Sequence, residues 1–317
     1  MDRVAEKVSA TTAARHRLIR GSAKTALDEV ADHSCRLVIT SPPYNIGKEY
    51  ERDRRRSIDA YVKWLEPIIA KASQKVSDDG HFCIQIGNYI RAGEVFPLDY
   101  YIYPLLAKRG FKLRNRVIWH FNFGLNANRR FSGRYETLLW FTKTDDYFFH
   151  LDAVRVPQLY PGKRHPKRKG ARSGLPSGNA KGKNPSDFWM FEPDEVMLRE
   201  GIWELPNVKA NHPEKTIHPC QFPSELVERC VLALTEDGDT VLDPFVGAGT
   251  TVIAAAKHGR VGIGIDKSKK YIRIAEGRLA DQLAGVVITR PIGLPVRRPR
   301  QGERVSRVPT EWKTAAE

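Results

Sequence analysis

The sequence predicts an α/β fold in which a mostly parallel β-sheet carries helices on both faces. Two patterns support this prediction. Apolar, β-branched segments alternate along the chain with segments whose apolar residues recur at helical spacing. Two of the apolar segments also end in loops built from Pro or Gly, which stop a strand abruptly or open a tight turn. With 317 residues, the chain is long enough for one large domain, or for one domain with a sizeable insertion.

The first half of the chain is expected to alternate between strands and helices and then to form a hairpin. Ser77-Asp78-Asp79-Gly80 indicates a turn between the longest helix and a buried strand. The expected strands are His16–Arg20, Leu37–Thr40, His81–Ile86 and Leu113–Phe121, the expected helices are Ala23–Ala31, Ser57–Val76 and Leu98–Arg109, and the expected hairpin pairs Glu136–Thr142 with Tyr147–Leu151.

The alternation resumes in the last third of the chain. The expected helices there are Pro223–Thr235, Thr250–Lys257 and Lys269–Gln282, and the expected strands are Thr240–Asp243 and Val261–Asp266. The first residues are polar and the tail from Arg290 onward is rich in Arg and Pro without periodicity. We expect a flexible N-terminus and a tail that is disordered or contacts nucleic acid.

The composition favours a polyanionic partner. The formal net charge of +15 and the pI near 9.7 are high for an enzyme of small metabolites, and nucleic acid is the simplest partner. No apolar run reaches membrane-spanning length and no signal peptide is visible, so we expect a cytoplasmic, nucleoid-associated protein without membrane contact. Cys35, Cys83, Cys220 and Cys230 form no CxxC pair, so neither a zinc site nor a disulfide framework is indicated.

The basic residues are concentrated in one segment. Between Arg155 and Pro185 there are nine Lys or Arg residues and no Asp or Glu, among many Gly, Pro and Ser. We expect this segment to contact phosphates, although a solvated loop would have the same composition. The candidate nucleic-acid-binding residues are Arg155, Lys163, Arg164, Lys167, Arg168, Lys169, Arg172, Lys181 and Lys183.

The motif TSPPY (residues 40–44) follows the strand that ends at Thr40. Its two prolines fix φ and remove two backbone donors, so the loop is rigid. Ser41 and Tyr44 are thereby presented at the carboxyl edge of the sheet, where open α/β sheets bind ligands. Taken alone, the motif fits a proline-stiffened loop with a core tyrosine equally well.

A second motif, DPFVGAGTT (residues 243–251), joins a strand to a helix. Gly247 and Gly249 allow positive φ and a close approach of a ligand to the backbone. Asp266 ends the next strand, where a carboxylate accepts both ribose hydroxyls of a nucleoside. The third glycine of a pyrophosphate-binding fingerprint is missing, which argues against a dinucleotide.

Together, the two motifs resemble those of the amino-methyltransferases of DNA, which use S-adenosyl-L-methionine. In that family the FxGxG strand and loop hold the cofactor, and the (D/N/S)PPY loop holds the target base. Here the base-holding motif comes first and the basic segment lies between the two motifs. This order resembles the family's β arrangement, a circularly permuted, Rossmann-like methyltransferase fold with a target-recognition insertion. The resemblance implies S-adenosyl-L-methionine, no metal, and a base flipped out of double-stranded DNA.

The resemblance also implies roles for individual residues. The catalytic loop would consist of Ser41, Pro42, Pro43 and Tyr44: the Ser41 hydroxyl and the Pro42 carbonyl would accept the amine hydrogens, and Tyr44 would stack on the base. Residues 215–223 resemble the family's third cofactor element, whose following helix, beginning at Pro223, would face the cofactor carboxylate. The candidate cofactor-binding residues are Ser22, Thr40, Thr216, His218, Gln221, Asp243, Phe245, Gly247, Gly249, Thr250 and Asp266.

Two places fit the family less closely. Ser22 stands where the family often has an Asp that contacts the adenine of the cofactor, which puts that contact in doubt. Trp119-His120 and Arg134-Tyr135-Glu136 lie where the family walls its base pocket, but a buried Arg–Glu pair would explain the latter equally well.

Serine at position 41 slightly favours cytosine N4, and adenine N6 is the alternative because adenine enzymes dominate the β order. Pro219-Cys220-Gln221 matches the motif of enzymes that methylate carbon 5 of cytosine through a thiolate. In those enzymes, however, the motif follows FxGxG, whereas here it precedes it. Remoter alternatives are a methyltransferase acting on RNA or on protein amides, and a binding protein without catalysis.

The predicted organisation has five parts: a flexible N-terminus (1–15), a catalytic half (16–152), a basic target-recognition insertion (153–208), a cofactor-binding half (209–285) and an Arg/Pro-rich tail (286–317). The expected partners are double-stranded DNA and a possible cognate restriction endonuclease. We expect a monomer or a homodimer.

Overall fold

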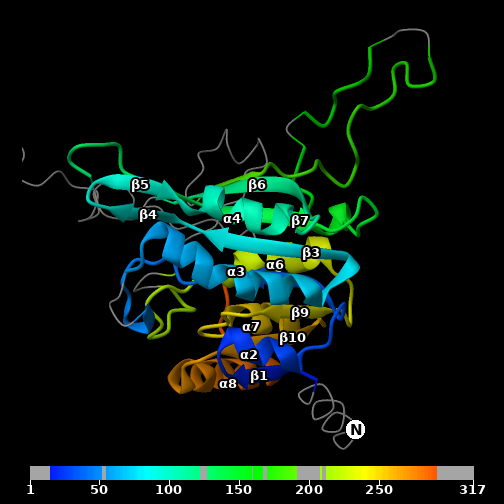
Figure 1. Ribbon diagram of the computed structural model, residues 1–317. Helices are drawn as coiled ribbons and strands as arrows, with labels where there is room; N and C mark the ends of the chain where they lie inside the picture. The colour runs from blue at the N-terminus through cyan, green and yellow to red at the C-terminus, as the bar shows by residue number, and fades with distance from the viewer. Residues whose placement is uncertain are drawn as a thin grey trace, which may run out of the picture.

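The structure, a computed structural model, describes residues 15–51, 55–121, 127–158, 160–166, 170–190, 208 and 212–290. Its described part is centred on an eight-stranded sheet with the order β1-β10-β9-β2-β3-β7-β6-β8 (Figure 1). The strands are β1 (Arg17–Arg20), β2 (Cys35–Thr40), β3 (Val76–Ile86), β6 (Lys112–His120), β7 (Tyr135–Thr142), β8 (Phe188–Met190), β9 (Thr240–Asp243) and β10 (Val261–Asp266).

The sheet is mostly parallel, as predicted. Strands β1, β10, β9, β2 and β3 run parallel to one another. Strand β7 is antiparallel to both β3 and β6, and β8 lies parallel to β6 at the edge. Strands β9 and β10 and the helix between them have the predicted bounds.

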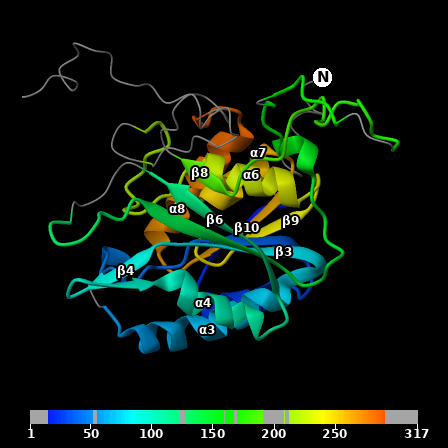
Figure 2. The ribbon, with the colours of Figure 1, turned by 90° about the horizontal axis from the view of Figure 1, so that it is seen from above.

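Helices cover both faces of the sheet: Figure 2 shows α3 and α4 on one face and α6 and α7 on the other. The two larger hydrophobic clusters accordingly lie under α2, α3 and α4 and under α6 and α7, and a small third cluster joins α7 to α8 through Val252 and Ile272. The helices are α2 (Ala23–Ala26), α3 (Ile58–Lys75), α4 (Leu98–Ala107), α6 (Ser224–Leu234), α7 (Thr250–Lys257) and α8 (Lys269–Leu283), with 3₁₀ turns at Leu27–Glu29, Glu49–Glu51 and Leu151–Val154.

Local signals explain where the longest helix begins and which face it buries. The Ser57 hydroxyl accepts a hydrogen bond from the Ala60 amide (3.3 Å) and caps α3. Tyr61, Leu65 and Ile68, spaced at helical intervals, are buried against the sheet. The first helix, by contrast, is shorter than predicted, because after Ala26 the chain tightens into a 3₁₀ turn.

The predicted turn at residues 77–80 lies inside β3 as an irregularity of the strand. Cys35 pairs with Val76 and Leu37 pairs with His81, so β3 advances five residues while β2 advances two. A Cβ on Gly80 would lie 2.6 Å from the Ser77 hydroxyl oxygen and 2.8 Å from the Arg36 carbonyl oxygen. The turn residues therefore form a tight bulge, and the strand continues beyond them.

The predicted hairpin between residues 136–142 and 147–151 is wrong. Strand β7 pairs instead with β6 and β3. The aromatic rings after β7 pack on the sheet: Tyr147 meets Trp140 edge-on at 5.8 Å and Phe149 stacks on Trp140 at 5.4 Å. A separate hairpin that we did not predict forms from β4 (Asn88–Arg91) and β5 (Glu94–Pro97).

Two predicted segments contribute to the folded body. The segment assigned to target recognition contributes β8 to the sheet, and the green stretch before β8 projects from the body in Figure 1. Residues 286–290 fall in the predicted tail; Val286 and Ile288 are exposed, whereas Arg290 is only 7% exposed and contacts the fold. Residues 1–14 and 291–317 lie outside the described residues. No described helix is long and apolar enough to span a bilayer.

Candidate active site

A cleft of about 310 Å³ lies at the carboxyl edge of the sheet, among the loops that follow β1, β2, β9 and β10. Neighbouring parallel strands end at the same edge, so loops far apart in the sequence meet there. Of the predicted site residues, the cleft is lined by Ser22, Ser41, Pro42, Pro43, Tyr44, His218, Gln221, Phe245, Gly247, Thr250 and Asp266. Thr40, Thr216, Asp243 and Gly249 are not among its lining residues.

The hydroxyl of Tyr44 is the centre of a polar cluster at one end of the cleft. It lies 2.9 Å from the Ser41 hydroxyl and donates to the Gln85 side-chain oxygen (2.5 Å) or to Glu136 Oε2 (3.2 Å). Gln85 also donates to Glu136. A Cβ on Gly87 would lie 3.2 Å from the Tyr44 ring and 3.3 Å from the Glu136 side chain, so the glycine gives both of them room.

This cluster fixes the direction of the Ser41 hydrogen bond. A phenol has a single hydrogen, which Tyr44 gives to an oxygen of Gln85 or Glu136. Ser41 must therefore donate its own hydrogen to the Tyr44 oxygen. The lone pairs of the Ser41 oxygen then remain available to accept hydrogen bonds from a group in the cleft.

The chain after Tyr44 is held by a second set of contacts. Asn45 is fully buried with φ 62°, and its side chain bonds both the backbone N–H (2.7 Å) and the carbonyl (2.8 Å) of Arg56. The Glu51 carboxylate accepts the amides of Asn45, Gly47 and Lys48. These contacts brace the TSPPY loop (residues 40–44) from its C-terminal side.

The glycine loop brings backbone close to the cleft. Gly247 has φ +50° and Gly249 has φ +86°. A Cβ on Gly247 would lie 2.9 Å from His218 Nε2, and one on Gly249 would lie 2.8 Å from the Ala275 Cβ. Both glycines are therefore required by conformation and by space.

Asp266 lies at the end of β10, beside this loop. Its carboxylate accepts hydrogen bonds from the amides of Gly247 (3.2 Å) and Ser268 (2.7 Å). Burial raises the pKa of Asp266, and the two backbone hydrogen bonds oppose that shift. The position suits a carboxylate that receives hydroxyl donors from a sugar.

The His218 ring lines the cleft next to Gly247 of the glycine loop. It packs edge-on against Tyr271 with 4.5 Å between ring centroids. The Cys220 amide donates to His218 Nδ1 (3.3 Å), which places the proton of the neutral ring on Nε2. Burial lowers the pKa of His218 to about 4, so the ring is uncharged at neutral pH. Behind it, Gln221 Oε1 accepts the amide and the hydroxyl of Thr216.

Asp243 joins the two motifs from beneath the cleft. One carboxylate oxygen accepts the Thr40 hydroxyl (2.6 Å) and the Phe245 amide (2.9 Å), and the other accepts the Thr251 hydroxyl (2.6 Å). Burial raises the pKa of Asp243 to about 6. The contacts of Thr40 and Asp243 thus connect the loops that carry the site.

The N-terminus of α6, which we expect from the resemblance to face the cofactor carboxylate, is occupied by an internal carboxylate. The buried Glu214 carboxylate already accepts the Ser224 amide (3.0 Å) and hydroxyl (2.6 Å) at that end. Pro223 precedes the helix as its cap residue and has no side-chain donor or acceptor. A helix end that already holds an internal carboxylate does not need a bound anion.

Several lining residues were not singled out from the sequence. Gln85, Trp64 and Tyr271 all line the cleft. The Trp64 ring lies 5.9 Å from the Phe245 ring, so α3 supplies an aromatic wall next to the glycine loop. Aromatic residues at helical spacing are usually core, which is why α3 gave no signal of a site. Of the residues considered for a base-pocket wall, Trp119 and Glu136 line the cleft, whereas His120, Arg134 and Tyr135 do not.

The basic segment is folded back on itself at its base. Val156 bridges Lys183, and Arg164 bridges Pro176. Arg155 and Lys181 both pair with Asp152, at 2.6 and 2.5 Å, so these two predicted DNA contacts are engaged in the fold. Lys163, Arg164 and Arg172 are exposed. The predicted contacts Lys167, Arg168 and Lys169 lie outside the described residues.

The fold and the cleft together define a class of protein: an α/β protein whose cleft has a glycine loop beside Asp266 at one end and a proline-stiffened hydroxyl loop at the other. The family model for DNA methylases of the N6-adenine and N4-cytosine type matches residues 35–277, and the chain belongs to this family. It is an S-adenosyl-L-methionine-dependent DNA amino-methyltransferase.

The chain is 41% identical over 261 residues to the Type II methyltransferase M.BglII of Bacillus subtilis, and the match covers 82% of this chain and 68% of that relative. It is 34% identical over 266 residues to the Type II methyltransferase M.ScaI of Streptomyces caespitosus, with coverage of 83% and 80%. Among solved structures, it is similar to TTHA0409 from Thermus thermophilus complexed with S-adenosyl-L-methionine. The TM-score is 0.56 at 28% identity, with 85% of this chain and 95% of that chain covered.

Proposed function

We propose that the enzyme flips a cytosine out of duplex DNA and methylates its exocyclic amine, N4. Ser41 accepts a hydrogen bond from that amine. The observation that carries this proposal is the hydrogen-bond chain from Ser41 through Tyr44 to Glu136, which leaves the Ser41 oxygen as an acceptor. An exocyclic amine lies inside the base pair of a duplex, so the base must leave the stack to reach the cleft, at a cost of a few kcal/mol.

The residues of the catalytic loop then have complementary roles. The Ser41 oxygen and the Pro42 carbonyl accept the two amine hydrogens, which turns the nitrogen lone pair out of conjugation with the ring. The prolines hold both acceptors in place before the base arrives, which is preorganisation toward the transition state. S-adenosyl-L-methionine supplies the electrophilic methyl group. No strong base is required, because the amine proton leaves after the transfer.

The cofactor-binding half is proposed to hold S-adenosyl-L-methionine across the glycine loop. Asp266 receives the ribose hydroxyls, and the positive-φ backbone at Gly247 and Gly249 leaves space for the nucleoside. The neutral His218 ring closes the methionine end. The remaining proposed contacts are Ser22, Thr216, Gln221, Phe245 and Thr250, with Thr40 and Asp243 supporting the loops from below.

The exposed cations of the basic segment are proposed to contact DNA phosphates. Lys163, Arg164 and Arg172 are the described residues best suited to this role, since Arg155 and Lys181 are paired with Asp152. Phosphate contacts set affinity and register, and base contacts must supply the sequence specificity. A cognate endonuclease that cuts the same site is the proposed partner in the cell.

The assignment of the base depends on Ser41, because serine in this loop goes more often with cytosine N4. Adenine presents a similar amidine edge, so the same acceptors would serve adenine N6. The decisive experiment is to express the protein in a host that lacks DNA methylation and to sequence the host DNA for modified bases. N4-methylcytosine at one short site supports the proposal. N6-methyladenine would show that adenine is the target. Unmodified DNA in a host that contains folded, soluble protein would contradict both base assignments.

A further inference from the structure

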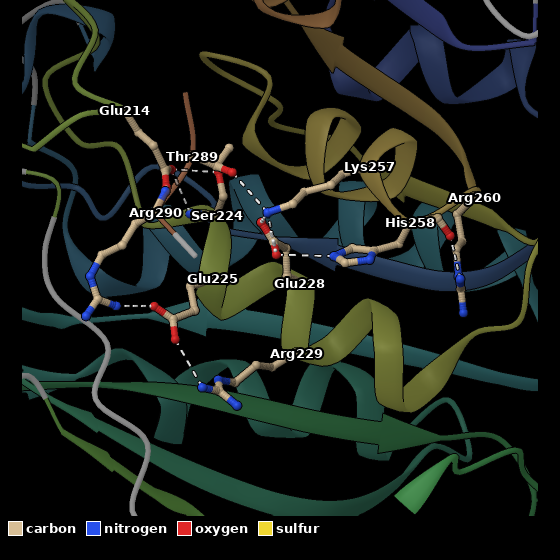
Figure 3. Close-up of polar contacts among 10 residues, drawn as sticks. All are labelled: Glu214, Ser224, Glu225, Glu228, Arg229, Lys257, His258, Arg260, Thr289 and Arg290. Atoms are coloured by element: carbon tan, nitrogen blue, oxygen red, sulfur yellow. Dashed lines mark hydrogen bonds and ion pairs between the residues drawn. The ribbon is translucent and has the colours of Figure 1, made fainter. Parts of the chain in front are cut away.

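Helix α6 is buried on almost all sides although it carries charged residues. Glu225, Glu228 and Arg229 are each less than a tenth exposed. A buried charge is costly unless it is paired. Figure 3 shows how the two acids are paired. Glu228 forms an ion pair with Lys257 (3.0 Å) and a hydrogen bond with His258 (3.2 Å), and Glu225 forms ion pairs with Arg229 and Arg290.

One of those arginines comes from the C-terminal strap, which we define as residues 286–290. Arg290 donates from its guanidinium to Glu225 (2.5 Å) and from its backbone amide to Glu214 (3.1 Å). The hydroxyl of Thr289 accepts a hydrogen bond from Lys257 (2.9 Å). The strap is therefore fixed to the fold through buried polar contacts of both side chain and backbone (Figure 3).

Glu214 connects this strap to the cofactor cleft. It is 3% exposed, and its carboxylate receives Arg290 on one oxygen and the start of α6 on the other. Its backbone carbonyl accepts the side-chain amide of Gln221 (2.8 Å), and Gln221 in turn holds Thr216. The loop that carries His218 thus begins at a residue whose side chain the strap helps to hold.

A separate contact supports the glycine loop from α8. Arg278 on α8 donates to the carbonyl of Ala248 (2.7 Å), next to both glycines of that loop. Burial lowers the pKa of Arg278, and the charge of Glu214 opposes this shift. The direct contacts of Glu214 are with the strap, the start of α6 and Gln221, so Glu214 acts on the wall that carries His218.

We propose that Glu214 and Arg290 are positioning residues for S-adenosyl-L-methionine: the C-terminal strap locks the loop of residues 214–221 in the geometry that receives the cofactor. This inference rests on the proposed assignment of Thr216, His218 and Gln221 to the cofactor. Neither Glu214 nor Arg290 lines the cleft, so they act through the loop.

The test compares Arg290→Gln with Lys75→Met in the full-length protein. Lys75 is a matched control, since it is 6% exposed, pairs with Asp32 (2.5 Å) and lies on α3, across the sheet from α6. Three quantities are measured: the Kd of S-adenosyl-L-methionine by calorimetry, kcat and KM for the cofactor, and amide hydrogen exchange in residues 214–221.

We expect Arg290→Gln to raise Kd and KM about ten-fold, with kcat at saturating cofactor changed less than about two-fold. Exchange in residues 214–221 should become faster. Lys75→Met should lower the melting temperature while leaving Kd and that exchange unchanged. The proposal is overturned if Arg290→Gln loses stability as the control does, while its Kd for the cofactor and the amide exchange in residues 214–221 stay unchanged.

Two further outcomes keep the test decisive. If Arg290→Gln does not fold, Thr289→Val removes the milder contact with Lys257 and should raise Kd about three-fold. An unchanged Kd in folded Thr289→Val then overturns the proposal. If exchange in residues 214–221 becomes faster in Arg290→Gln but Kd is unchanged, the assignment of Thr216, His218 and Gln221 to the cofactor fails, which is a different result from a failure of the strap to hold the loop.

Discussion

At the scale of the residue, Tyr44 combines two properties in one side chain. Its ring lines the cleft, while its hydroxyl fixes Ser41 as an acceptor. Replacing Tyr44 with Ala removes both, and a base–aromatic stack is worth about 1–3 kcal/mol, or roughly 5- to 150-fold in kcat/KM for DNA. Tyr44→Phe and Tyr44→Trp should lose less, because a ring remains. Single-turnover methyl transfer measures this, and equal losses for all three variants would exclude stacking.

His218 gives a prediction about pH. Its pKa is lowered to about 4 by burial, from an ordinary value of 6.5. Between these values the unfolded chain binds the proton and the folded chain does not, so the stability that the neutral ring provides is present above pH 6.5 and is lost as the pH falls toward 4. We expect unfolding free energy to fall by on the order of 1–2 kcal/mol more in the unsubstituted protein than in His218→Asn over this range.

Urea titrations at pH 4, 5, 6 and 7 measure that difference. The pKa of His81 is also lowered to about 4 by burial, and His81 remains in the variant, so only the difference in slope reports on His218. Parallel stability curves for the two proteins would contradict the assigned pKa.

At the scale of the element, the loop before α7 contains two glycines with positive φ, Gly247 and Gly249. A helix does not normally require glycine at its start. Gly247→Ala would place a Cβ 2.9 Å from His218 Nε2 in a backbone with φ +50°. We expect cofactor affinity to fall at least about ten-fold, since strain of about 1–3 kcal/mol must be relieved by moving the loop or the ring.

The matched substitution is Gly277→Ala on α8, where a Cβ meets nothing within 4 Å. Alanine is the better helix former, so this variant should be more stable by about 0.5–1 kcal/mol and bind the cofactor normally. Calorimetry and thermal unfolding of both variants measure the contrast. Equal cofactor affinities in the two would show that the close approach at Gly247 is unimportant.

At the scale of the whole molecule, the net charge of +15 and the projecting basic segment predict strongly salt-dependent DNA binding. Lys163→Ala combined with Arg172→Ala should reduce the slope of log Kd against log salt by up to about 1.8, since each phosphate that is no longer neutralised reduces it by about 0.9. Lys71→Ala is the control: Lys71 lies on α3, outside the basic segment, and forms an ion pair with Asp28. Slopes that do not differ between the two proteins would rule out these phosphate contacts.

The local parts of this fold were predictable from the sequence. Strands β9 and β10 and helix α7 have the predicted bounds, because apolar periodicity and glycine punctuation act within a few residues of the chain. The cleft itself could also be anticipated: parallel strands that end near Ser41, Gly247 and Asp266 must bring those residues to one edge.

Which distant groups meet was decided only by the tertiary structure. Tyr44 finds Gln85 and Glu136 because β3 and β7 are neighbours, and the predicted hairpin would have paired β7 differently. Glu214 reaches the start of α6 and the strap through contacts that no short pattern encodes. The physical reason is that periodicity reports what each segment buries, whereas the partner of a buried polar group depends on which segments pack together. The sequence alone determined the two motifs and the chemistry they indicate, and the packing of the sheet decided what holds them in place.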